Sequence, residues 1–320
     1  MSQIKIVALN QSGELVDVPD KDDGDVTKGM TQEQADAWND EMSSLKTLNF
    51  ICFLWHLAQG SIMLTFSYTR PALADFTLPV FTLFTDWTAG YPVQTIDFWR
   101  SFCYLRLCSF FALLSALAHG LVLVFFKKYE RDLRRGLNRF RWYEYALSSS
   151  LMVMLVFWLW GNFDWVQLTG VFVINMCMNL FGDCHELLNA GKKPEDIDWT
   201  AFRYGWFAGM IPWLLVWFTV GFYAVKYWED LGNGADIPVW FWVVLVEYFL
   251  LFQSFPFNLS RQYKQKGKFK DELYPLLPNG GYLRGEKIYQ WLSLIAKTIL
   301  LWQIAIAAWS PDDTYSGVSR

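Results

Sequence analysis

The chain has 320 residues, of which 53% are hydrophobic, 19% aromatic and 18% charged, with a formal net charge of −4. Soluble proteins usually carry more charge, about a quarter of their residues, so the composition argues against a soluble fold. The sequence contains no phosphate-binding loop, metal-ligand spacing or nucleophile–base set that would indicate an enzyme, and no basic, aromatic-rich patch that would indicate nucleic-acid binding.

The N-terminal residues 1–30 form an acidic tail that contains DVPDKDDGDV. This tail is unlike a signal peptide, because its charged region is acidic and no cleavable apolar core follows. The next stretch, TQEQADAWNDEM (31–42), is expected to be a helical lead-in to the first apolar run. We therefore expect an acidic tail over 1–30, a seven-helix membrane domain over 31–310 and an extracellular C-terminal tail over 311–320.

Seven apolar runs follow this tail, each about 20 residues long, which is the length that crosses a bilayer as a helix. Polar or charged stretches separate all of them except the third and fourth, which are joined by GNFDW (161–165). The sequence therefore predicts an all-α membrane protein with one domain of seven transmembrane helices. The expected spans are 46–68, 98–126, 142–162, 165–188, 203–227, 238–259 and 286–309.

The basic residues indicate the orientation in the membrane. They concentrate in the segments after the second, fourth and sixth spans, of which KKYERDLRRGLNRFR (127–141) is the richest. The opposite loops hold few, such as Arg70 and Lys226 close to span ends. Since Lys- and Arg-rich loops remain in the cytoplasm, we expect a multi-pass protein with a cytoplasmic N-terminus and an extracellular C-terminus, the reverse of most seven-helix receptors.

The first extracellular loop, residues 69–97, is long enough to hold its own structure. Two apolar stretches, LPVFTLF and YPVQTIDF, flank the turn-forming DWTAG within it. This pattern predicts a β-hairpin. The alternative is an irregular loop on the membrane surface.

Ionisable side chains inside the spans are few, and buried ionisable groups in membrane proteins usually mark function. Arg106 and Glu247 have no evident role, and we consider that they pair with each other. The full set is His56, Arg106, His119, Glu144, His185, Glu186, Glu247 and Lys297.

Lys297 lies in the middle of the apolar run IYQWLSLIAKTILLWQ (288–303). A lysine at mid-bilayer costs roughly 2.5–3.5 kcal/mol on insertion scales, so it needs a partner. Glu144 in the third span is the natural one, because at about 1.5 Å per residue the two depths differ by about 7 Å. The structural alternative is a buried ion pair that only holds two helices together.

A lysine removed from water is partly neutral and can attack a carbonyl. The imine that it forms with an aldehyde is protonated and needs a fixed carboxylate. Seven helices, a lysine in the last, a carboxylate in the third and many aromatic residues therefore indicate a retinal-binding photoreceptor.

At this point the sequence resembles a known family. The chain is similar to the heliorhodopsins, microbial rhodopsins of inverted topology, over residues 40–310. The motifs that carry the resemblance are WHLAQG (55–60), SALAHG (115–120), RWYEYALSSS (141–150), NMCMNLFGDCHE (175–186) and LSLIAK (292–297).

The resemblance implies that Lys297 carries all-trans retinal as a protonated Schiff base and that Glu144 is its counterion. Ser148 and Ser293 would form hydrogen bonds near that group. The residues that would line the chromophore are Tyr145, Asn175, Met178, Gly182, Gln253 and Pro256.

The family also has a polar, water-holding cavity between the chromophore and the cytoplasm. Each matching residue also has a purely structural interpretation. A histidine on an apolar face is often a hydrogen-bonded core residue, and Glu186 can simply lie at a helix end at the membrane interface. The matching positions are His56, Gln59, Ser115, His119, Arg141, Tyr145 and Glu186.

Two regions qualify the resemblance. Gly205 and Gly209 in GWFAG lie where heliorhodopsins pair as homodimers, although the glycines alone can also serve close helix packing. Asp183 and His185 depart from the family pattern and make the end of the fourth span unusually polar. This departure bears on whether the cytoplasmic cavity is closed.

Three functions remain open from the sequence. The first is a light sensor with a slow photocycle and an unknown signalling partner. The second is light-driven or light-gated proton transport, although Leu155 stands where outward pumps have a second carboxylate. The third is a non-photic membrane protein with a structural Lys297–Glu144 pair.

Overall fold

The computed structural model describes residues 7–9, 15–17, 26–226 and 239–309. Within these ranges seven helices are long and apolar enough to cross a membrane, which confirms the predicted fold class. The predicted tail at 311–320 and most of the acidic tail lie outside the described residues, apart from a short antiparallel pair, β1 (Val7–Leu9) and β2 (Leu15–Asp17). The seven long helices are α1 (Gln32–Thr69), α3 (Tyr104–Val124), α5 (Arg139–Leu159), α6 (Trp165–Asn189), α7 (Thr200–Lys226), α9 (Val239–Tyr263) and α10 (Gly280–Trp309).

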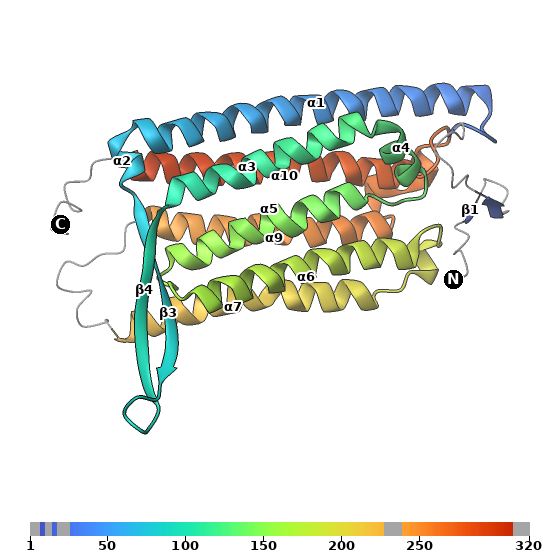
Figure 1. Cartoon of the computed structure of the whole chain (residues 1–320). Helices are drawn as coiled ribbons and strands as arrows, with labels where there is room; N and C mark the ends of the chain where they lie inside the picture. The colour runs from blue at the N-terminus through green and yellow to red at the C-terminus, as the bar shows by residue number, and fades with distance from the viewer. Residues whose placement is uncertain (1–6, 10–14, 18–25, 227–238, 310–320) are drawn as a thin grey trace.

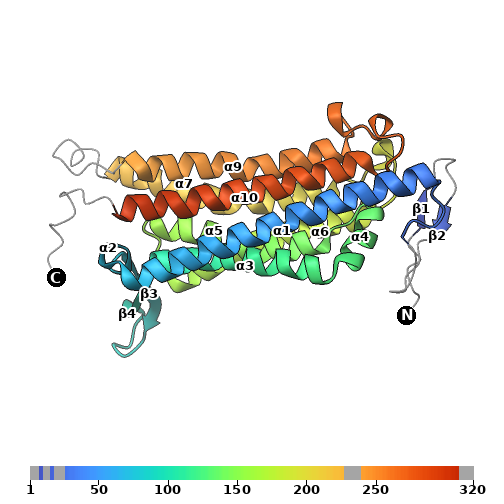
Figure 2. The same cartoon turned by 90° about the horizontal axis from the view of Figure 1, so that it is seen from above.

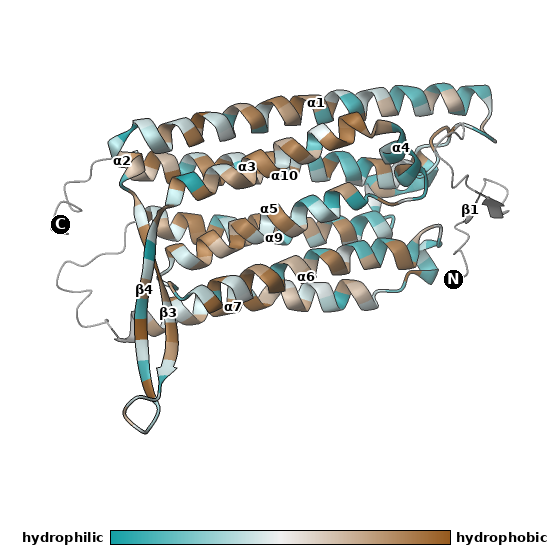
Figure 3. Cartoon of the chain, viewed as in Figure 1, coloured by the Kyte–Doolittle hydropathy of each residue, from teal (hydrophilic) through white to brown (hydrophobic). Residues whose placement is uncertain are grey.

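These helices form one elongated bundle (Figures 1 and 2). In it α1 packs on α3 and α10, α5 lies between α3 and α6, and α7 packs on α6. We call the end at which α1 begins the basic end, because the connecting segments 125–138, 190–199 and 264–279 lie there and are rich in lysine and arginine. Figure 3 shows polar residues gathered at this end. The opposite end, where α10 finishes, is called the hairpin end.

Local signals explain where the helices begin. Thr31 caps α1 in a reciprocal capping box with Gln34, so the expected lead-in and the first span form one continuous helix. Asn138 caps α5 by accepting a hydrogen bond from the Arg141 amide at 3.1 Å. Asp164 caps α6 in the same way, through the Gln167 amide.

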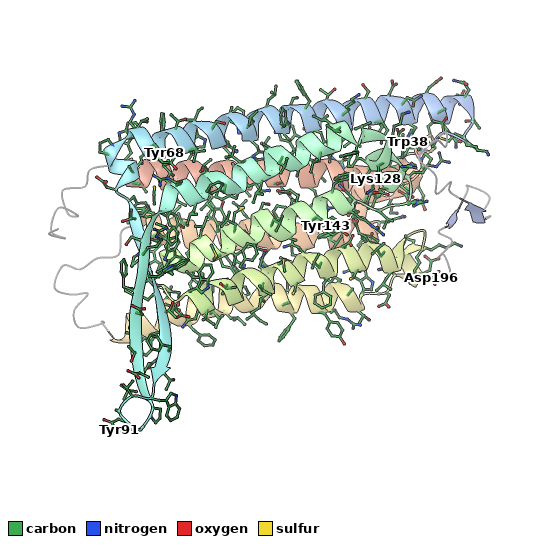
Figure 4. The ribbon with its side chains drawn as sticks, viewed as in Figure 1. Trp38, Tyr68, Tyr91, Lys128, Tyr143 and Asp196 are labelled. Atoms are coloured by element: carbon green, nitrogen blue, oxygen red, sulfur yellow. The ribbon has the colours of Figure 1, made fainter. Side chains whose placement is uncertain are left out.

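The predicted β-hairpin is present at the hairpin end. Strand β3 (Thr77–Asp86) pairs antiparallel with β4 (Val93–Cys103). Its base is fixed to the α5–α6 turn, because the Phe81 amide donates to the Phe163 carbonyl at 2.9 Å. The tip, marked by Tyr91 in Figure 4, stands away from the bundle.

The second span starts later than predicted. Residues 98–103 belong to β4, where they pair with residues 77–81 of β3, and α3 starts only at Tyr104. Arg106 therefore lies in the first turn of α3, near the hairpin end. The short helix α2 (Pro71–Ala74) precedes the hairpin, and α4 (Phe126–Arg134) follows α3 at the basic end.

The supposed pairing of Arg106 with Glu247 is wrong. Arg106 Nη2 donates to the Ser67 carbonyl at 3.1 Å, and its guanidinium lies 3.8 Å from the ring centre of Tyr68. Glu247 on α9 accepts a hydrogen bond from Gln303 on α10. Arg106 and Glu247 thus each contact a different residue that is close in space but distant in the sequence.

The two halves of the bundle differ in polarity. The half toward the hairpin end is a large apolar core that includes the buried residues Leu155, Trp158, Leu301 and Ile304. The buried polar residues of the basic half include His56, Asn138, Arg141, Glu186 and Glu286. Among the described residues, the largest group of buried polar side chains therefore lies in the middle and the basic half.

Candidate functional site

Lys297 on α10 meets Glu144 on α5 at the middle of the bundle. Lys297 Nζ lies 2.6 Å from Glu144 Oε1 and 2.7 Å from Ser293 Oγ, which is one turn earlier on α10. Lys297 is only 2% exposed, so the amine is removed from solvent. The lysine side chain thus bridges the difference in depth that the sequence indicated.

Three donors converge on one oxygen of Glu144. Besides the lysine, Ser115 Oγ from α3 and Ser148 Oγ from α5 each donate to Oε1 at 2.6 Å. Hydrogen bonds to a carboxylate stabilise its charged form. The arrangement can therefore hold a negative charge beside a cation at Lys297.

An aromatic cavity begins at the lysine and runs between α5, α6, α7 and α9. It contains about 920 Å³ of space free of protein atoms, part of which is open to the outside. Seven of the predicted residues line it: Tyr145, Met178, Gly182, Gln253, Pro256, Ser293 and Lys297. Gly205 and Gly209, which the sequence analysis assigned to the dimer region, also line it. Further wall residues that the sequence analysis did not single out include Trp142, Met152, Asn179, Phe202, Trp206, Met210, Trp213, Phe252, Phe255 and Tyr289.

Gly182 shows why one cavity position needs the smallest residue. A Cβ atom there would overlap the indole of Trp142, which forms part of the cavity wall. The glycine thus allows α6 to approach α5 while the indole remains in place.

Asn175 does not line the cavity, contrary to the resemblance-based expectation. Its side-chain amide donates to Ser149 Oγ at 3.0 Å and to Ser150 Oγ at 3.1 Å, so it links α6 to α5. Asn179, one turn closer to the basic end, is the asparagine of α6 at the cavity. The two residues lie on the same helix face, and spacing alone cannot tell which one reaches the wall. Ser148 also lies outside the wall and contacts Glu144 instead.

These residues fit a retinal attached to Lys297. A long apolar polyene needs an aromatic and aliphatic cavity that ends at the attachment nitrogen, and the protonated linkage needs a carboxylate there. The cavity wall, Lys297 and Glu144 supply both features.

A smaller polar cavity lies on the basic side of Glu144. Of the residues expected there, His119, Arg141 and Tyr145 line it together with Glu144. Ser115 reaches it through its bond to Glu144, and His56 stacks on His119 at 5.8 Å between ring centres. Gln59 is attached to His56, at 2.9 Å from its Nδ1. Further wall residues that the sequence analysis did not include are Asn49, Tyr129, Asn138, Glu286, Tyr289 and Gln290.

Arg141 forms part of the cavity wall toward the basic end. Its guanidinium is ion-paired with both Glu186 on α6 and Glu286 on α10. All three side chains are at most 3% exposed. Glu286 was missed because it lies at the expected edge of the last span, whereas α10 begins earlier, at Gly280.

Asp183 and His185 do not join the polar cavity. His185 is buried among Trp199, Phe202 and Tyr263, with ring centres 5.4, 5.9 and 4.6 Å away. Its Nδ1 lies 3.1 Å from the side-chain amide of Asn189. His185 thus packs in a separate aromatic cluster, and neither His185 nor Asp183 lines the polar cavity.

Gly205 and Gly209 are used for packing within the chain. A side chain at Gly205 would crowd Phe181, and one at Gly209 would crowd Met178, both on α6. The glycines therefore explain the close contact of α6 and α7, and the expected homodimer draws no separate support from them.

Comparison with known proteins agrees with this geometry. The family model described as Heliorhodopsin matches residues 45–308, which is most of the chain and all seven long helices in whole or in large part. No curated protein matches the sequence.

Proposed function

Because the chain belongs to the heliorhodopsin family, a family of retinal-binding membrane photoreceptors, we propose that Lys297 carries all-trans retinal as a protonated Schiff base. The observation that supports this most is the contact of Lys297 with Glu144 at the end of the aromatic cavity. The bound retinal would supply visible absorption and a light-driven change of shape.

The protein's own residues would then have distinct tasks. Glu144, held by Ser115 and Ser148, is the counterion that keeps a positive charge stable at Lys297. Ser293 fixes the nitrogen of the lysine from the other side. The aromatic wall excludes water, which strengthens the attraction between the two charges.

We place the basic end of the bundle in the cytoplasm and the hairpin end outside. The support is the concentration of lysines and arginines in the loops of the basic end. In this orientation the polar cavity lies between Lys297 and the cytoplasm.

The polarity of the two halves favours a sensor over a pump. A proton leaving the site has acceptors on the basic side, at Glu286, Glu186 and the histidines, whereas the buried position Leu155 on the other side is apolar. The proton would stay within the cavity and return from the same side. We therefore propose slow recovery after light, and signalling through a change in the bundle to a partner protein.

A homodimer remains part of the proposal. Many large apolar side chains of α6 and α7 face outward, including Val173, Phe207, Leu214 and Phe218. These surfaces suit lipid as well as a second copy of the chain.

Adding all-trans retinal to the retinal-free protein should produce a new visible absorption band. The attachment of retinal to a buried, charged site shifts its absorption away from that of the free aldehyde. The measurement is an absorption spectrum before and after addition, followed by flash photolysis to time the recovery. A spectrum that remains that of free retinal would leave the structural ion pair as the better explanation.

Illumination should produce no steady current at zero voltage and equal pH on both sides. The reason is that the polar cavity beside Glu144, with its carboxyl groups and His119, lies on the basic side of Lys297, whereas the large apolar core lies on the other side. The measurement is voltage-clamp recording from cells that express the protein, with the Lys297→Ala variant as the control for light artefacts. A steady current would indicate a pump, and a current that reverses near the proton equilibrium potential would indicate a proton leak.

A further inference from the structure

The cluster around Arg141 contains more acidic side chains than basic ones. Two carboxyl groups, of Glu186 and Glu286, contact one guanidinium, and each of the three side chains is at most 3% exposed. In the described part of the chain, Arg141 is the only cation that is ion-paired with either carboxyl group. If both carboxyl groups were ionised, the cluster would bury one uncompensated negative charge, which is strongly unfavourable.

The other groups around the pair do not supply a second positive charge. They are amides, tyrosines and the indole of Trp142, apart from the acidic Asp183 and from Arg139, whose charge acts on Asp183. The titratable and charged side chains that face the cluster from the packed elements are Tyr129 on α4, Arg139 and Tyr145 on α5, Asp183 on α6, Tyr263 on α9, and Tyr282 and Tyr289 on α10.

The two carboxyl groups have different surroundings. Glu186 accepts hydrogen bonds from Arg141, from the Tyr282 hydroxyl at 3.0 Å and from the Asn138 amide at 2.8 Å. Glu286 accepts from Arg141 and from the Asn138 side-chain amide at 2.6 Å. The side chains of Tyr129 and Gln290 also form hydrogen bonds with Glu286. Both carboxyl groups are therefore held by several donors, and Glu286 is the one that lines the polar cavity.

An acceptor for a proton on Glu286 is close by. Gln290 follows Glu286 by one turn on the same face of α10, and both line the polar cavity. The side-chain oxygen of Gln290 is buried and has no hydrogen-bond partner among the described residues. A protonated carboxyl group gains an O–H donor that can serve such an oxygen.

We propose that Glu186 and Glu286 share one proton beside Arg141, so that the cluster is a proton store. The stored proton gives the cluster zero net charge: one carboxylate, one guanidinium and one neutral carboxylic acid. Such sharing is the usual result when two acids occupy one site.

The proton store would supply protons during the proposed photoreceptor cycle, and this role rests on the proposed function. Glu286 and Glu144 line the same cavity, together with His119 and Tyr145. Glu286 can give its proton to a base in the cavity, and the carboxylate that forms is then stabilised by Arg141. A proton from the cytoplasm would restore the acid.

Infrared spectroscopy of the retinal-free protein at neutral pH tests the proton store without any photochemistry. The wild type should show the C=O stretch of a buried carboxylic acid, shifted in heavy water. Glu286→Gln should lose that intensity because the acid is removed. Glu186→Gln should lose it too, because Glu286 then has Arg141 to itself and ionises. Glu41→Gln is the matched control, since Glu41 is ion-paired one-to-one with Lys287 at 2.9 Å and should leave the acid signal unchanged.

The infrared spectra of the two single variants decide whether the proton is shared. Loss of one acid signal in each single variant supports the shared proton. Persistence of the full signal in either variant would overturn it, as would a wild type with no carboxylic-acid signal at neutral pH, a result that does not depend on whether the variants fold. Because retinal is absent throughout, failure of the store leaves the assignment of Lys297 to be judged separately.

Discussion

The Lys297→Ala variant is expected to show no visible absorption band after all-trans retinal is added. No other lysine side chain is described in the aromatic cavity, so retinal would have no amine to bind there. The measurement is an absorption spectrum of the purified variant, compared with the wild type at the same protein concentration. The expected effect is complete loss of the band.

A loss of colour must be distinguished from a loss of fold. Removing Lys297 leaves Glu144 buried without its cation, which typically costs about 3–5 kcal/mol of stability. The double variant Lys297→Ala with Glu144→Gln removes both charges and should fold better while remaining colourless. Lys287→Ala, the other lysine of α10, is the matched control and should keep the band, since Lys287 pairs with Glu41 at the basic end. A visible band in the folded double variant would refute attachment at Lys297.

The Glu144→Gln variant is expected to lose its visible band at a lower pH than the wild type. The glutamine removes a negative charge 2.6 Å from Lys297 Nζ. A nearby opposite charge shifts such a titration by roughly one to three pH units. Because the missing charge favoured the protonated form, the midpoint must move down. Alternatively, an external anion binds where the Glu144 carboxylate was, and the absorption band then shifts to the red. Titrations with and without chloride would distinguish anion binding from a simple loss of the protonated form.

Glu247→Gln is the matched control for this second variant. Glu247 is also a glutamate within a span, but its partner is Gln303, and it does not line the aromatic cavity. Its replacement should leave both the band and the midpoint as in the wild type. If Glu144→Gln also left them unchanged, another carboxyl group would have to be the counterion. Glu186 would be a poor substitute, because it is bound to Arg141.

Much of this arrangement could be predicted from the sequence, because membrane constraints are strong. A run of apolar residues has to be a helix in lipid, so all seven spans were found. A lone lysine at mid-span needs a carboxylate at similar depth, which led to Glu144. The alternating pattern on both sides of DWTAG led to the β-hairpin.

The remaining features depend on how the helices pack against one another, and the pattern of apolar runs carries no information about that packing. Glu286 was missed because α10 begins at Gly280, several residues before the apolar run that was used to predict the span. Asn175 was placed at the chromophore where Asn179 lies, since one turn along a helix keeps the same face. Arg106 was placed too deep, because the apolar residues of β4 resembled the start of a span.

Mapping the site of covalent attachment tests the central assignment most directly. The retinal-loaded protein would be treated with borohydride, which makes the linkage permanent, then digested and analysed by mass spectrometry. We predict one retinyl group per chain, carried by the peptide that contains Lys297, and none on that peptide without added retinal. A retinyl group on any other lysine, or none at all in a protein that shows the visible band, would contradict the assignment.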